Sequence, residues 1–78
     1  MDFNDKWARS KVEGAIKEYV LGVWNRANIE WAVGEVHFAV EKMLVPLDEI
    51  RIMISRAEAS ASESGKERVA ELRKRLAI

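Results

Sequence analysis

The residues that interrupt helices are few in this chain, and their spacing limits its possible folds more than any other feature. In 78 residues there is one proline, Pro46, and there are four glycines. No stretch alternates apolar and polar residues as a half-buried strand does. Alanine, leucine, glutamate, lysine and arginine, which favour helices, are abundant. The pattern predicts an all-α fold, a small helical bundle of three to four helices.

A short polar stretch separates the first two expected helices. Apolar periodicity indicates one helix over residues 5–24 and a second over residues 29–44, with Asn28 in the N-cap position. Because the break at residues 25–28 leaves room only for a turn, we expect these two helices to form an antiparallel hairpin.

Pro46 marks the start of the third helix, because a first helical turn leaves the N–H group that proline lacks unpaired in any case. Asp48 and Glu49 follow, where negative charge faces the positive end of the helix dipole. We expect this helix over residues 47–61.

Residues 60–65, rich in serine, form the weakest segment for regular structure. Within and after it, Ser64 and Glu67 fit a capping box, in which each side chain satisfies a backbone donor of the other. We therefore expect a break here and a fourth helix that begins at Gly65. The alternative is one long helix over residues 47–76.

The length of the chain fits one small domain. We expect residues 1–78 to form a single helical domain, with residues 65–78 as an alternative, separate basic C-terminal helix. A core of this size leaves a thin stability margin. The chain has no cysteine, so no disulfide or thiolate metal site supplements that core. This absence favours self-association or a very regular helical core.

Charge is dense but balanced, with 13 lysines and arginines against 13 aspartates and glutamates. Zero net charge predicts no general attraction to nucleic acid or to an anionic membrane. The chain opens with acidic residues where a signal peptide has a basic region and an apolar run. No apolar stretch approaches the ~18 residues of a membrane span. We therefore expect a cytoplasmic protein without a membrane partner.

Two of the expected helices carry aromatic residues opposite their core-facing side. At about 100° per residue, the apolar side of the second helix comprises Ile29, Ala32, Val33, Val36, Ala39, Val40, Met43 and Leu44. Trp31 and Phe38, seven positions apart, fall almost opposite the centre of that side. The first helix repeats the arrangement, with Trp7, Gly14 and Leu21 on the far side of its own apolar stripe.

A second contact face is the economical interpretation of these residues. Glycine in a helix interior costs up to about 1 kcal/mol, so Gly14 and Gly34 indicate close approach of another backbone. The simplest partner is another copy of the chain. Two alternatives stay open: the later helices fold back over this face, or the aromatics are exposed incidentally. The predicted partner-binding residues are Trp7, Gly14, Leu21, Trp31, Gly34, Glu35, Phe38 and Lys42.

The C-terminal segment supports an alternative function. Around a narrow apolar stripe, it carries the cations Lys66, Arg68, Arg73, Lys74 and Arg75. Doubled by dimerisation, this helix would meet phosphates in a nucleic-acid-binding regulator. Glu67 and Glu71 dilute the positive charge, and no aromatic residue is interleaved for base stacking. We therefore favour a solvated terminal helix over a nucleic-acid reader.

No recognisable catalytic constellation is present in the sequence. It has no cysteine and no Gly-x-Ser-x-Gly turn, and its glycines are not gathered in a phosphate-binding loop. His37 shares one helix edge with Glu30 and Glu41, which is a weak basis for a metal-assisted enzyme. We predict a non-enzymatic protein–protein interaction module (an adaptor, regulator or inhibitor). It should self-associate as a homodimer and need no cofactor or metal.

Overall fold

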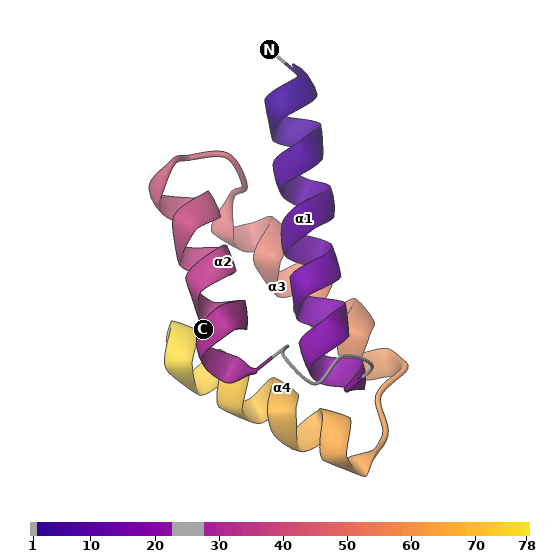
Figure 1. Cartoon of the computed structure of the whole chain (residues 1–78). Helices are drawn as coiled ribbons and strands as arrows, with labels where there is room; N and C mark the ends of the chain where they lie inside the picture. The colour runs from indigo at the N-terminus through magenta and orange to yellow at the C-terminus, as the bar shows by residue number, and fades with distance from the viewer. Residues whose placement is uncertain (1, 23–27) are drawn as a thin grey trace.

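The computed structural model describes residues 2–22 and 28–78, and the regular structure in that part of the chain is all helical. The elements are α1 (Asp2–Leu21), α2 (Ile29–Glu41), α3 (Leu47–Ala59) and α4 (Glu63–Leu76). α1 and α2 pack side by side in opposite directions, α3 passes behind α1, and α4 crosses the C-terminal end of α1 and the N-terminal end of α2 (Figure 1). The predicted helical bundle is confirmed.

The two ends of α2 are set by different local signals. At its start the Asn28 side chain accepts a hydrogen bond from the Trp31 backbone N–H at 2.9 Å, which confirms the predicted N-cap. The helix ends at Glu41 rather than at residue 44 because Met43 adopts a left-handed conformation, with φ of 58°. The N–H of Leu44 then bonds the carbonyl of Ala39 at 2.9 Å, as in a Schellman motif.

α3 and α4 are two helices, so the alternative of one long helix over residues 47–76 is wrong. α3 ends at Ala59, two residues before the predicted end. The N-cap of α4 is Ser62, whose hydroxyl accepts a hydrogen bond from the Gly65 N–H at 3.3 Å. The predicted capping box at Ser64 is therefore shifted, because Ser64 already lies inside the first turn of the helix.

Gly65 allows close packing between α4 and the end of α1. A Cβ atom at this buried position would lie 2.9 Å from the carbonyl oxygen of Val20 and 2.8 Å from the Cβ of Ala61. Both distances are shorter than side chains tolerate, so only glycine lets the two backbones approach here. α1 ends just beyond Val20, at Leu21, and is followed by Gly22 with φ of +67°. The predicted end at Trp24 and most of the predicted turn at 25–28 lie outside the described residues.

The core lies between the four helices and receives apolar side chains from each of them and from the α2–α3 turn. Its largest fully buried members are Ile16, Ile50, Ile54, Leu72, Val12, Val20, Val36, Val45 and Val69. Full burial of one such side chain contributes about 1.5–3 kcal/mol. Among the described residues no charged side chain is fully buried, although the hydrogen bonds of Arg68 with the Val20 carbonyl and of Arg73 with Glu58 are partly buried.

Over residues 2–22 and 28–78, no helix combines the length and the apolar character that crossing a bilayer requires.

Candidate functional site

The N-terminal half of α1 and the C-terminal half of α2 bring two exposed aromatic side chains to one shallow depression. Trp7 and Phe38 are each 54% exposed, and both line this depression. Between them lie Lys11 and Glu35, with small and apolar side chains of the two helices beneath. The depression has a volume of only about 10 Å³, far below the ~300 Å³ of a typical small-molecule pocket. The depression is therefore too small to hold a small-molecule ligand.

Two lysines border these aromatics. The Lys11 ammonium lies 5.0 Å from the centre of the Trp7 ring and 3.6 Å from a carboxylate oxygen of Glu35. The Lys42 ammonium lies 6.0 Å from the centre of the Phe38 ring. An apolar centre with a charged border is the usual anatomy of a protein interface. We call Trp7, Lys11, Glu35, Phe38 and Lys42 the aromatic patch.

The two predicted close-approach glycines have open space around them within the subunit. No atom lies within 4 Å of the place where a Cβ would stand at Gly14 or at Gly34. The glycine that does permit a close approach inside the protein is Gly65, which sequence reasoning did not single out for this role. Its position directly after a serine-rich break was the available signal, but the contact with Val20 is not local.

Trp31 and Leu21 lie away from the aromatic patch. Trp31 is half-buried and packs against the core cluster, which agrees with the alternative that later helices fold back over this face. α2 contacts α4 as well as α1, so two sides of α2 face other helices. Leu21 is exposed, but fourteen residues of helix place it about 20 Å along α1 from Trp7.

The arginines of α4 contact the other helices of the subunit. Each has a partner: the Val20 carbonyl for Arg68 at 3.1 Å, Glu58 for Arg73 at 3.1 Å, and Glu71 and Glu30 for Arg75 at 3.3 and 3.7 Å. Lys66 and Lys74 are exposed. Three of the predicted phosphate-binding cations are therefore already engaged with carbonyl or carboxylate oxygens.

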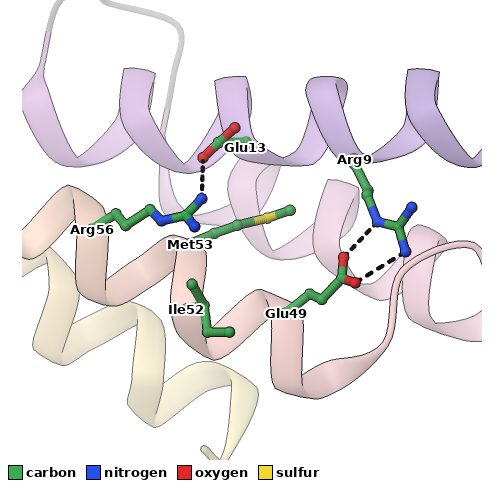
Figure 2. A pocket seen from close by; sticks show the side chains of 6 residues that line it. All are labelled: Arg9, Glu13, Glu49, Ile52, Met53 and Arg56. Carbon is green, nitrogen blue, oxygen red and sulfur yellow. Dashed lines mark hydrogen bonds and ion pairs between the residues drawn. The ribbon is translucent and has the colours of Figure 1, made fainter.

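A larger groove between α1 and α3 was not predicted. It has a volume of about 310 Å³, and its exposed apolar side chain is Ile52 (Figure 2). Arg9 donates two hydrogen bonds to Glu49, and Arg56 lies 3.6 Å from Glu13. Each carboxylate in the groove thus faces an arginine, which leaves no uncompensated charge to bind an ion. The only sequence signal was the position of Ile52 opposite the apolar side of its helix.

Titratable groups give little support to catalysis. Burial raises the pKa of the Tyr19 phenol above its usual value, and the Glu71 carboxylate adds to the rise, while Arg68 and Arg75 oppose it. His37 is exposed on α2. In the part of the chain that the structure describes, no three histidine, aspartate or glutamate side chains gather where they would hold one metal ion.

No family model, curated protein or solved structure matches this chain.

Proposed function

We propose that this protein is a non-enzymatic, cytoplasmic interaction module (an adaptor, regulator or inhibitor) that self-associates through the aromatic patch. One observation carries the proposal. Trp7 and Phe38 come from two different helices, share one small depression, and each leave about half of their surface in water. Large aromatics at the centre of an interface supply most of its binding energy.

The size of the aromatic patch indicates how tight such an association is. The exposed halves of Trp7 and Phe38 amount to about 200 Å² per subunit. Their burial on both subunits would contribute roughly 10 kcal/mol. Association itself costs about 4–15 kcal/mol. The balance lies between about −6 and +5 kcal/mol, short of the roughly −8 kcal/mol of a micromolar dimer, so such a dimer requires further contacts from the polar border.

The contacts of α4 favour this proposal over the nucleic-acid alternative. Neutralising phosphates requires cations that are free to leave their present partners. Arg68 donates a hydrogen bond to the Val20 carbonyl of α1 and Arg73 donates one to Glu58 of α3, both at 3.1 Å. Binding a phosphate through them would therefore break contacts that hold α4 in place.

The test is sedimentation equilibrium of the whole chain from about 1 µM to about 500 µM, which brackets a micromolar dissociation constant. We expect a dimer for the wild type and a shift toward monomer for Phe38→Ala and Trp7→Ala, with unchanged helical circular dichroism. The matched control is Ile52→Ala, which removes a similarly exposed apolar side chain from the α1–α3 groove. A wild type that stays monomeric throughout would contradict self-association.

A further inference from the structure

The outer surface of α2 presents a row of four exposed residues of contrasting chemistry. Residues four apart lie on one ridge of a helix, and Glu30, Gly34, Phe38 and Lys42 form such a ridge. The Glu30 side chain is 77% exposed and the Phe38 residue 54% exposed, while Gly34 and Lys42 are also exposed. We call these four residues the α2 ridge.

The α2 ridge is complementary to itself when its direction is reversed. Read along the helix it runs acid, glycine, aromatic, base. A two-fold axis between Gly34 and Phe38 places the acid of one copy opposite the base of the other, twice, because such an interface pairs each residue reciprocally. The same axis places Phe38 of each copy opposite Gly34 of the other.

Gly34 supplies the space that this arrangement needs. The position of its missing Cβ has no atom within 4 Å, so a ring from outside can reach the helix backbone there. A ridge that must cross a copy of itself requires such a gap, since ridges pack into grooves and not onto one another. This explains a glycine that otherwise costs α2 about 1 kcal/mol without a contact inside the subunit.

We propose that a second copy of this chain docks antiparallel on the α2 ridge, with Phe38 over Gly34 of the other copy and Lys42 beside Glu30 of the other copy. This proposal rests on the proposed function and adds the partner's orientation. Trp7, which shares the depression with Phe38, borders the contact on the α1 side. The ion pair of Glu30 with Arg75, at 3.7 Å and well exposed, is too weak to compete strongly.

Other exposed surfaces do not carry such a pattern. The turn after α2 exposes Met43 and Leu47 beside Pro46, but its lining is apolar throughout and has no charge that would orient a partner. In the α1–α3 groove the charges are paired within the subunit. The α2 ridge is the surface on which the order of charges selects one orientation of a second copy.

Charge reversal tests this orientation. Glu30→Lys places two lysines opposite two lysines in the dimer, and Lys42→Glu places two glutamates opposite two glutamates. We expect each variant alone to dimerise about tenfold more weakly or worse, since two attractive pairs become repulsive. An equimolar mixture of the two variants should form a heterodimer with about the wild-type affinity, because every reversed pair then meets its opposite. The control is Glu67→Lys, which makes the same charge change at an exposed position on α4.

Filling the gap provides an independent variant. Gly34→Leu should weaken dimerisation at least about tenfold and leave the helical circular dichroism intact, because nothing in the subunit occupies that space. All variants are compared by sedimentation equilibrium and urea unfolding. A wild-type dimer that Glu30→Lys and Lys42→Glu leave unchanged overturns the orientation while self-association stands, and so does a mixture that stays monomeric. A monomeric wild type overturns the proposed function as well.

Discussion

The two ends of the α1–α2 pair differ in what covers them. At the closed end (Val20, Trp31, Gly65 and Arg68) α4 packs across both helices. Gly65 lies against the backbone of α1, and Arg68 donates a hydrogen bond to the Val20 carbonyl. At the open end (Trp7, Phe38 and Met43) no described helix lies over the aromatic side chains, and Met43 is 90% exposed.

The comparison shows that two aromatic residues on one face of a helix can have different surroundings. Trp31 and Phe38 are two turns apart on α2, yet the first packs against the core and the second stays at the surface. The difference arises from the position of α4 and not from the local sequence of α2. An aromatic opposite a core stripe therefore indicates a second contact, but it does not indicate whether that contact is internal.

The largest effect should come from Gly65→Ala at the closed end. The added methyl group would meet the Val20 carbonyl at 2.9 Å and Ala61 at 2.8 Å, so we expect a loss of about 3 kcal/mol in the free energy of unfolding. The measurement is urea unfolding followed by circular dichroism. The matched control is Gly14→Ala, which meets no atom within 4 Å and should gain about 0.5–1 kcal/mol. Equal changes in the free energy of unfolding at the two positions would mean that α4 does not pack closely against α1 at Gly65.

Truncating the aromatics compares the two ends directly. We expect Trp31→Ala to lower the unfolding free energy by about 2 kcal/mol, because it removes a half-buried ring from the edge of the core. Phe38→Ala should change the stability of the monomer by less than about 0.5 kcal/mol. Urea unfolding at concentrations below dimer formation measures both. If Phe38→Ala lowers the free energy of unfolding as much as Trp31→Ala does, Phe38 is packed within the subunit and the open end is covered.

A smaller gain in stability is expected at the open end from Met43→Gly. Met43 holds φ of 58°, a conformation that costs a residue with a side chain about 1 kcal/mol and glycine almost nothing. The substitution should raise the midpoint of urea unfolding accordingly. Ser60→Gly is the control. Ser60 is the C-cap residue of α3 with φ of −103°, so glycine relieves no backbone strain there. A Met43→Gly variant no more stable than wild type would argue against the left-handed helix end.

The smallest effect is a pH dependence at the closed end. Because burial raises the pKa of Tyr19 above its unfolded value, the neutral phenol stabilises the fold. This contribution is fully present below about pH 10 and is lost as the pH rises through the higher folded pKa. Wild type should therefore lose more stability than Tyr19→Phe between pH 8 and pH 11, measured by urea unfolding. Parallel losses in the two proteins would mean that the folded state does not disfavour the phenolate.

What could be predicted from the sequence was mostly local. Asn28 caps α2 as predicted because capping needs only a side chain and the next turn. The cap of α4 was misplaced by two residues, since Ser62 and Ser64 are equivalent locally and the contact between Gly65 and Val20 belongs to the tertiary fold. For the aromatic patch, periodicity selected Trp7 and Phe38. It could not place Trp31, whose surroundings depend on α4.

The hydrogen bond from Arg68 to the Val20 carbonyl has a consequence for synthesis on the ribosome. It joins residues 48 positions apart, and Gly65 packs at the same carbonyl. The last carbonyls of a helix are otherwise left without partners, so α1 receives its final contacts only after α4 has left the exit tunnel. We therefore expect folding to be completed late, only after α4 has emerged.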